Sequence, residues 1–284
     1  MAVLVLASAS GAPGVTTLAL GLALTWPRSV ILVDADPSAS QAVLAGFLGG
    51  QVRTGKGLLR VAEGHRDRRP LREVVSDQTV PLADDPATSR RLLPGFVRPG
   101  NAALFEPVWP ELAETFVRFG DSGIDVVVDL GRLGAGGVPQ ALLERADVCA
   151  LVTRSSLRAL AAARWHGTQL AEQARLAGGG DLAGVVVIGE GRPYRSAEIA
   201  ALLGLPVLST VPDDPESAAA LVDGGRRSRR FDTAPLPRAL PHVGAELQAR
   251  IGSRSDRLDD GAAAAPRPSP TEPVGVAAVP GSRR

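Results

Sequence analysis

The stretch that decides the fold is Ala2-Val-Leu-Val-Leu-Ala-Ser-Ala-Ser-Gly-Ala-Pro-Gly-Val-Thr-Thr-Leu-Ala-Leu-Gly-Leu-Ala23. It begins with a short apolar run that predicts a buried β-strand, passes through a loop of small residues, and ends in an Ala/Leu-rich run that predicts a helix. Glycines in such a loop let backbone N–H groups point at one place, and the helix N-terminus adds a partial positive charge there. The stretch therefore predicts a strand–loop–helix unit that can cradle a phosphate.

The rest of the chain repeats this alternation of strand and helix. The predicted strands are Val3–Ala7, Val30–Val33, Ile124–Val128, Val148–Val152, Gly184–Ile188 and Val207–Val211. The predicted helices are Thr16–Leu24, Pro139–Ala146, Leu157–Leu176, Ser196–Leu203 and Glu216–Val222. Each strand is a near-continuous apolar run, which is typical of strands covered on both faces. We predict an α/β fold with a doubly wound, mostly parallel sheet and helices on both faces.

Two segments depart from this rhythm. Residues 49–120 are rich in Arg, Pro and Gly, and we expect an irregular excursion of short helices with one further strand near Arg91–Pro94. From Ser253 onward the chain contains few large apolar residues and cannot offset its ordering entropy by burial. We therefore expect one domain over residues 1–252 and a disordered tail over residues 253–284.

Composition excludes several classes of protein. The net charge of +1 over 284 residues argues against a protein that binds polyanions with its whole surface. The single cysteine, Cys149, rules out an internal disulfide and fits a reducing compartment, so we expect a cytoplasmic protein. The apolar run Val274–Val279 is too short to predict a membrane helix. The three tryptophans, Trp26, Trp109 and Trp165, are expected to be buried against the core or against the excursion.

Acidic residues follow two of the predicted strands. Asp34 and Asp36 end the second strand, and Asp129 ends the strand that begins at Ile124. Open α/β sheets bind their ligands at the carboxyl ends of the strands. A single acid at such a place is usually a helix cap, but the ordered set of a glycine loop, an Asp-x-Asp pair and a further Asp favours one anion-binding crevice.

These features together resemble the ParA/MinD superfamily of P-loop ATPases, the deviant Walker A group that includes partition proteins and the CpaE/TadZ pilus-positioning proteins. The family loop K-G-G-x-G-K-T-T is similar to Ser10-Gly-Ala-Pro-Gly-Val-Thr-Thr17. The family's D-x-D-P and Walker B aspartate are similar to Asp34-Ala-Asp-Pro37 and Asp129. The stretch Pro206–Asp213 is similar to the family's late strand, whose following loop borders the adenine. The similarity covers about residues 1–225.

The resemblance implies ATP and Mg²⁺ as ligands. It implies that Asp36 is the catalytic residue that orients the attacking water, and that Thr16 and Asp129 hold the metal. The nucleotide-binding residues that it implies are Gly11, Ala12, Gly14, Val15, Thr16, Thr17, Pro212 and Asp213.

The chain lacks both lysines of the family loop. Val15 stands at the P-loop lysine, and Ser10 stands at the signature lysine that reaches the partner's phosphates in an ATP-sandwich dimer. The only lysine of the chain, Lys56, lies far downstream. Phosphoryl transfer depends on positive groups around the transferred phosphate, and removal of one costs roughly 10²–10³ in rate. We therefore expect weakened ATP binding and slow or absent hydrolysis.

Arginines are the remaining candidates for positive charge. Arg132 and Arg154 follow predicted strands and are candidates to replace the missing lysine; the alternative is that both are ordinary loop arginines. Arg226, Arg227, Arg229 and Arg230 form the densest basic cluster and are candidates for non-specific DNA contact, or else a solvated charge run.

The interpretation that the residues favour is a pseudo-ATPase or weak ATPase. Such a protein would act as a scaffold in intracellular positioning or partition of a chromosome, a plasmid, or a secretion or pilus machinery. We expect a protein partner and, without a lysine that acts across a dimer, a homodimer that does not depend on ATP. One alternative is an active Mg-ATP hydrolase with an arginine in place of the lysine. A more distant one is a Rossmann-type dinucleotide-binding protein in which Asp34 or Asp36 binds a ribose.

Overall fold

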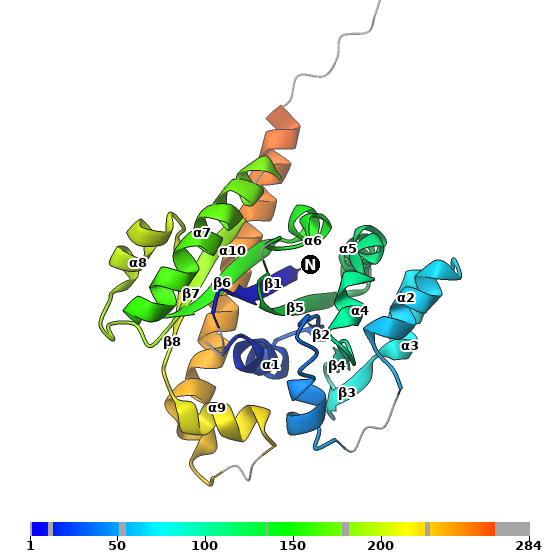
Figure 1. Ribbon diagram of the computed structural model, residues 1–284, viewed down its shortest axis with the longest axis horizontal. Coiled ribbons are helices and arrows are strands. Elements are labelled where there is room, and N and C mark those ends of the chain that lie inside the picture. The colour runs from blue at the N-terminus through cyan, green and yellow to red at the C-terminus, as the bar shows by residue number, and fades with distance from the viewer. Residues whose placement is uncertain are drawn as a thin grey trace, which may run out of the picture.

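A central sheet of eight strands runs through the computed structural model, which describes residues 2–10, 14–50, 55–134, 136–177, 182–224 and 228–264 (Figure 1). The strand order is β3-β4-β2-β5-β1-β6-β7-β8, and all neighbours pair in parallel except β3 with β4. The strands are β1 (Val3–Ser8), β2 (Ser29–Asp34), β3 (Val80–Ala83), β4 (Arg90–Leu93), β5 (Ile124–Arg132), β6 (Val148–Arg154), β7 (Ala183–Ile188) and β8 (Val207–Val211).

Helices cover both faces of this sheet. They are α1 (Val15–Thr25), α2 (Leu58–Arg66), α3 (Leu71–Gln78), α4 (Gly100–Ala103), α5 (Trp109–Phe119), α6 (Gln140–Arg145), α7 (Leu157–Leu176), α8 (Ser196–Leu203), α9 (Pro215–Val222) and α10 (Pro235–Ala264), with short helical turns η1 (Val43–Phe47), η2 (Glu106–Val108), η3 (Gly120–Ser122) and η4 (Phe231–Thr233).

The core is split into two layers by the sheet. Val3 and Val5 of β1 belong to the cluster that holds the apolar residues of α2, α3 and α5 to α8. Leu4 and Leu6 belong to the cluster that holds those of α1, α9 and α10. Successive side chains of a strand point to opposite faces, so both faces of β1 are buried. The predicted doubly wound α/β fold is confirmed.

The excursion between β2 and β5 contains one strand that the sequence predicts and one that it does not. The strand expected near Arg91–Pro94 is β4, which pairs with β2. Strand β3 was not expected because it contains Pro81, which cannot donate a ladder hydrogen bond. The strand lies at the edge of the sheet, where a proline is tolerated.

Helix α10 was not expected either. Pro235, Pro237 and Pro241 indicate a break, although the first two lie in the first turn, where proline is tolerated. Its buried apolar residues recur every three or four positions and are Leu236, Leu240, Val243, Leu247 and Ile251. The helix continues to Ala264, past the predicted start of the tail at Ser253, and residues 265–284 lie outside the described residues.

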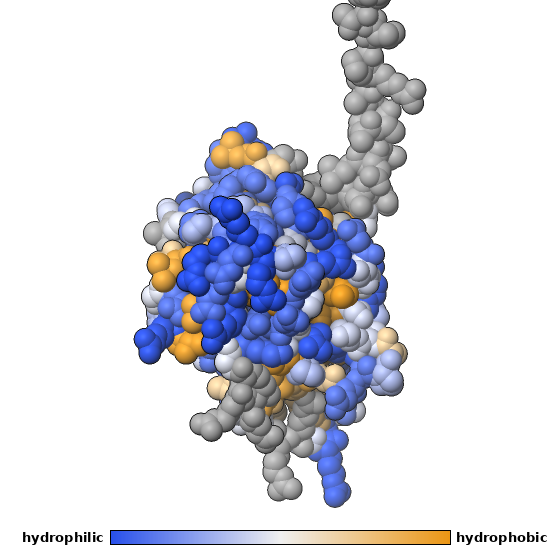
Figure 2. All heavy atoms as spheres, turned by 90° about the vertical axis from the view of Figure 1, so that its right-hand side faces the viewer, coloured by the Kyte–Doolittle hydropathy of each residue, from blue (hydrophilic) through white to orange (hydrophobic). Residues whose placement is uncertain are grey.

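The surface carries one feature that contradicts the sequence interpretation. Trp26 and Trp109 are buried as expected, but the side of α7 that faces solvent carries Trp165, which is 56% exposed. The expectation for Trp165 was therefore wrong. The face of the molecule that carries α2 and α3 is largely hydrophilic with scattered apolar patches (Figure 2). Within the described ranges, every helix is too short or too polar to cross a bilayer.

The docking of α10 on α1 gives a test of the fold. A Cβ atom at Gly21 of α1 would lie 2.6 Å from Cδ1 of Leu240, so the two helices are in close contact. Leu240→Ala should lower the free energy of unfolding by about 2–4 kcal/mol, measured by urea denaturation, because it leaves a cavity in this layer. The matched control is Leu202→Ala on α8, where the leucine is 41% exposed and the loss should stay below about 1 kcal/mol. Equal losses in the two variants would show that α10 is not docked.

Candidate functional site

The acidic strand ends lie at one edge of the sheet. Strand β5 lies between β2 and β1, and Asp34 of β2 is in register with Asp129 of β5. Strand β1 lies between β5 and β6; the connection from β1 runs to β2 on one side, whereas the connection from its neighbour β6 runs to β7 on the other. Ligands of open α/β sheets bind at this kind of switch point. The structure thus brings the end of β1, the aspartate pair and Asp129 together.

Helix α1 begins at this edge. Gly14 precedes it with a φ of +106°, a backbone conformation that favours glycine, and a Cβ there would lie 3.1 Å from Ile188 Cδ1. Among the described residues no side chain caps the first turn of α1, so its N–H groups remain free to bind an anion. The predicted site residues Gly11 and Ala12 lie outside the described residues.

A cleft with a volume of about 520 Å³ opens above these strand ends. Its lining comes from the end of β1, the start of α1, the ends of β2, β5 and β6, and one side of α9: Ser8, Gly14, Val15, Thr16, Thr17, Asp36, Ser38, Gly131, Arg132, Arg154, Pro215, Ala218, Ala219, Val222 and Asp223. A smaller and more apolar pocket of about 40 Å³ shares Gly14 and Thr17 with the cleft and adds Ile188, Val211 and Pro212. The predicted residues Pro212 and Asp213 lie in this pocket.

Asp36 is held in a fixed position by two serines. Its carboxylate accepts hydrogen bonds from the backbone N–H of Ser38 (2.8 Å), the hydroxyl of Ser38 (2.6 Å) and the hydroxyl of Ser40 (3.2 Å). Gly131, with a φ of +60°, lies directly against it, because a Cβ there would be 2.4 Å from Asp36 Cγ. Any side chain at residue 131 would displace Asp36.

Burial makes the other two acids difficult to ionise. Desolvation, followed by the charge of Asp129, raises the pKa of Asp34 to about 7. Desolvation also raises the pKa of Asp129 to about 6, although this carboxylate accepts hydrogen bonds from the hydroxyl of Thr16 and, at 2.8 Å, from the N–H of Gly131. The pocket therefore concentrates negative charge that lacks a nearby ammonium group.

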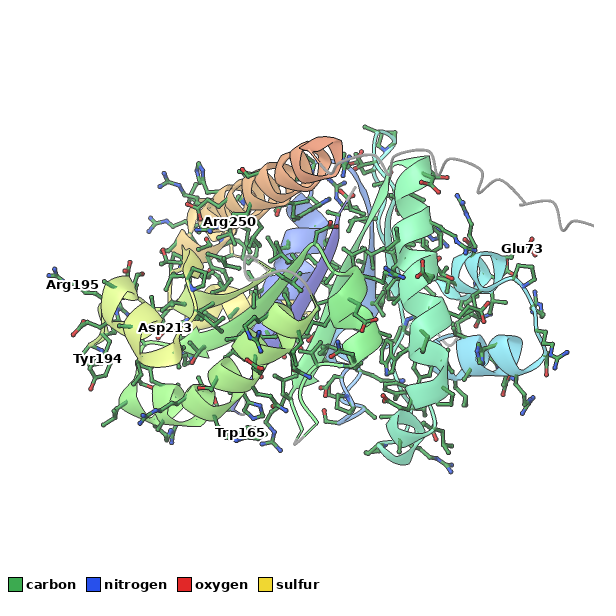
Figure 3. The ribbon with its side chains drawn as sticks, turned by 90° about the horizontal axis from the view of Figure 1, so that it is seen from above. Glu73, Trp165, Tyr194, Arg195, Asp213 and Arg250 are labelled. Carbon is green, nitrogen blue, oxygen red and sulfur yellow. The ribbon has the colours of Figure 1, made fainter. Side chains whose placement is uncertain are left out.

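Among the described residues that line the cleft, the cationic side chains are two arginines, Arg132 and Arg154. Val15 is buried in the apolar cluster that contains α1, and Lys56 donates to the carbonyl oxygen of Thr79, outside the cleft lining. Arg132 is exposed at the cleft, and no carboxylate among the described residues pairs with it. Arg154 donates to Asp213 at 2.8 Å, an ion pair that joins the ends of β6 and β8 across β7 (Figure 3 labels Asp213).

The groups that line the cleft, which are N–H groups, arginines, a hydroxyl and carboxylates, fit a nucleotide phosphate with a magnesium ion better than a metal ion held by protein alone. Mg²⁺ prefers carboxylate and hydroxyl oxygens and keeps waters and phosphates in its coordination shell, so one or two protein ligands suffice. The contact between Thr16 and Asp129 offers such a pair. In the part of the chain that the structure describes, no group of three His, Cys, Asp or Glu side chains is arranged to hold a metal on its own.

The basic cluster near the C-terminus is only partly described. Arg226 and Arg227 lie outside the described residues, whereas Arg229 and Arg230 are exposed. The two described arginines line a recess of about 710 Å³ together with three acids, Asp214, Glu216 and Asp223. These acids reduce the positive potential that a phosphate backbone would meet.

Sequence reasoning missed the residues that support the acids. Ser38 and Ser40 follow Asp36 closely in sequence. An aspartate whose carboxylate accepts a hydrogen bond from the N–H two residues later forms a recognisable turn, so the sequence did carry a signal for the contact with Ser38. Gly95 carried no such signal: it follows β4, far from β2 in sequence, yet a Cβ there would lie 2.8 Å from Asp34 Oδ1. The ion pair of Arg154 with Asp213 likewise depends on strand order and not on spacing.

Comparison with known proteins identifies the fold. No family model and no curated protein matches the sequence. A chain of the MinC:MinD cell division protein complex of Aquifex aeolicus matches with a TM-score of 0.66 and 19% identity, covering 88% of this chain and 96% of that one. A ParA family ATPase from Chlorobium tepidum matches with a TM-score of 0.66 and 17% identity, covering 86% and 98%. The chain has the MinD/ParA fold. A variant of Cyanothece McdA in complex with ATP shares it, with a TM-score of 0.63, 17% identity, and coverage of 89% and 96%.

The buried acids of this site predict a pH dependence of stability. Asp34 has a usual pKa of 3.8 and a folded value of about 7, so the folded state holds its proton over a range in which the unfolded state has lost it. Its contribution to stability is fully present below about pH 4 and is lost as the pH rises through about 7. Without divalent cations, the free energy of unfolding of Asp34→Asn should therefore rise relative to that of the wild type between pH 4 and pH 8, by about 4 kcal/mol.

The measurement is urea denaturation of both proteins at several pH values. The control is Asp85→Asn, because Arg90 and Thr88 hold the pKa of that partly buried carboxyl below its usual range and the difference should have the opposite sign. A constant difference between Asp34→Asn and the wild type across this range would contradict a raised pKa at Asp34.

Proposed function

We propose that this chain is a ParA/MinD-type protein with a degenerate nucleotide site, a pseudo-ATPase or weak ATPase that acts as a cytoplasmic scaffold in intracellular positioning or partition. The observation that carries the proposal is that the site has the groups that bind metal and phosphate but not the lysine. The Thr16–Asp129 contact and the open N-terminus of α1 are present, whereas the residue at the P-loop lysine position, Val15, is packed in the apolar core.

The retained residues can bind phosphate and metal. The N–H groups at the start of α1 are oriented towards the cleft, and Thr16 and Asp129 would hold Mg²⁺, which when bound neutralises phosphate charge. Binding of a cation here would also relieve the crowding of carboxylates that raises the pKa of Asp34 and Asp129. Asp36 lines the cleft and, in this proposal, would orient the attacking water molecule.

The residues that accelerate phosphoryl transfer are the ones that are missing. Charge spreads over the transferred oxygens in the transition state, and positive groups fixed in place stabilise it. Val15 supplies no charge, and the nearest cations are guanidinium groups that come from β5 and β6. We therefore infer that this chain retains nucleotide binding but hydrolyses the nucleotide slowly or not at all. Its partners would then act on a protein that does not cycle between nucleotide states.

The second candidate function, an active Mg-ATP hydrolase, is favoured by one observation. Arg132 lines the cleft and is not neutralised by any carboxylate in the described ranges. The dinucleotide alternative has less support, because Asp34 is buried beneath Gly95 and Asp36 is already bound by Ser38 and Ser40. Neither acid is free to accept hydrogen bonds from a ribose.

Restoring the lysine tests the degenerate site. Wild type should bind Mg-ATP weakly in isothermal titration and release phosphate slowly or not at all. Val15→Lys should raise the rate of phosphate release by at least about tenfold, because an ammonium group then meets the transferred phosphate. Val15→Met is the matched control, since it has a long unbranched side chain without charge. Equal rates in the two variants, or fast hydrolysis by the wild type that Asp36→Ala abolishes, would contradict the proposal.

The two arginines should differ in their contribution to nucleotide affinity. Arg132→Ala should weaken Mg-ATP binding by on the order of tenfold, because it removes the cation that no acid neutralises. Arg154→Ala should have a smaller effect, since Asp213 already engages that guanidinium. Isothermal titration measures both, and Arg132→Lys should recover part of the loss. Unchanged affinity in both alanine variants would leave the helix N-terminus as the only phosphate-binding element.

A further inference from the structure

A second cavity opens on the face of the sheet opposite α1, where β2 and β5 end. It has a volume of about 150 Å³ and extends to the segment that runs from α4 to α5 (Figure 1). Asp36 and Gly131 line the cleft, whereas their neighbours Pro37 and Leu130 line this cavity, which we call the β2–β5 pocket. Arg132 lines both. The β2–β5 pocket is therefore a separate site that shares one cation with the cleft.

The wall of the β2–β5 pocket is apolar and fixed in place. Phe96, Trp109 and Leu133 line it, and all three are buried. The ring of Phe105 packs edge-on against Phe96 on one side, with ring centres 5.4 Å apart, and against Trp109 on the other, at 4.8 Å. The two aromatic side chains of the wall are thus held before any ligand binds. An apolar cavity of this size accepts a group as large as a benzene ring.

Two opposite charges lie at this apolar wall. The carboxylate comes from Glu106 at the start of η2, and the guanidinium group comes from Arg132 at the end of β5. Both side chains are exposed, and within the described ranges neither forms an ion pair with the other or with a third residue. A ligand with a single charge would be attracted by one of these groups and repelled by the other. A ligand that carries both an ammonium group and a carboxylate satisfies both.

A free α-amino acid combines these two charges with a side chain. An apolar side chain matches the wall, whereas a polar one would lose its hydration without gaining a hydrogen-bond partner from the phenyl ring of Phe96 or from Leu133. A residue within another protein fits less well, because its amino and carboxyl groups are neutral amides. Such a residue would leave the charges of Glu106 and Arg132 without partners.

We propose that the β2–β5 pocket binds a free apolar α-amino acid of the size of leucine or phenylalanine. Its side chain packs against Phe96, Trp109 and Leu133. Its carboxylate pairs with Arg132 and its ammonium group pairs with Glu106. Apart from Arg132, these residues lie outside the lining of the cleft, so binding requires no nucleotide.

Isothermal titration of the purified full chain without nucleotide tests the choice of ligand. L-Leucine or L-phenylalanine should bind. Analogues without the ammonium group (isocaproate, hydrocinnamate) and analogues without the carboxylate (isoamylamine, phenethylamine) should each bind at least about tenfold more weakly than the parent amino acid, because each leaves one charge of the pocket without a partner. Glycine should also bind more weakly, because it has no side chain to cover the wall.

Charge-neutral variants test the two polar contacts separately. Glu106→Gln should weaken binding of the amino acid by on the order of tenfold and remove its advantage over the analogue without an ammonium group. Arg132→Gln should do the same relative to the analogue without a carboxylate. The matched control is Glu73→Gln on α3, where the glutamate is exposed and lies outside the pocket lining (Figure 3), and this variant should bind as the wild type does.

A further variant tests the apolar wall. Ala102→Phe places a ring in the pocket and should abolish binding, with thermal unfolding as the check that the variant is folded. The proposal is overturned if neither amino acid binds, if an analogue with one charge binds as tightly as its parent, or if Glu106→Gln and Glu73→Gln bind alike. Because nucleotide is omitted throughout, a failure of ATP binding leaves these outcomes unaffected.

Discussion

The rest of the site depends on the close approach of three carboxylates at adjacent strand ends. Parallel pairing of β2 with β5 puts Asp34 beside Asp129, and Gly131 lets Asp36 reach the same edge. Water is largely excluded there, so these charges repel strongly and the pKa values of Asp34 and Asp129 rise. Such an arrangement lowers the stability of the free protein near neutral pH. It is an arrangement suited to a pocket that a cation completes.

In the proposed function, Val15 in place of a lysine changes the balance of charge in this pocket. In a P-loop, a lysine at that position neutralises phosphate and offsets nearby acids, whereas here the side chain contributes to the apolar layer beneath α1. On this proposal the cleft keeps oxygen ligands suited to a metal ion but lacks the fixed cation that would stabilise the transition state. Arginines at other strand ends are larger and arrive from other directions, so they can bind phosphate without reproducing the geometry of the lysine.

The sequence predicted the fold where the signal was local and repeated. The buried runs of β1, β2 and β5 to β8 read as covered strands because both faces are apolar, and the acids at their ends could be placed at one edge from chain order alone. Sequence reasoning missed α10. Pro235, Pro237 and Pro241 indicate a break in this segment, and its apolar spacing gains meaning only once the helix is known to pack against α1 and β8. It also missed the support that Gly95 gives Asp34, and it placed Trp165 in the core, because a tryptophan's exposure depends on which face of α7 meets the sheet.

The cleft and the start of α7 are joined by a short segment that is tied to a neighbouring loop. Arg154 lies in the cleft, Leu157 begins α7, and Ser155 between them donates to the carbonyl of Tyr194 at 2.6 Å and accepts from its N–H at 3.0 Å. These reciprocal bonds tie the start of α7 to the loop before α8. A cleft wall fixed in this way is preorganised, which lowers the entropic cost of binding a ligand.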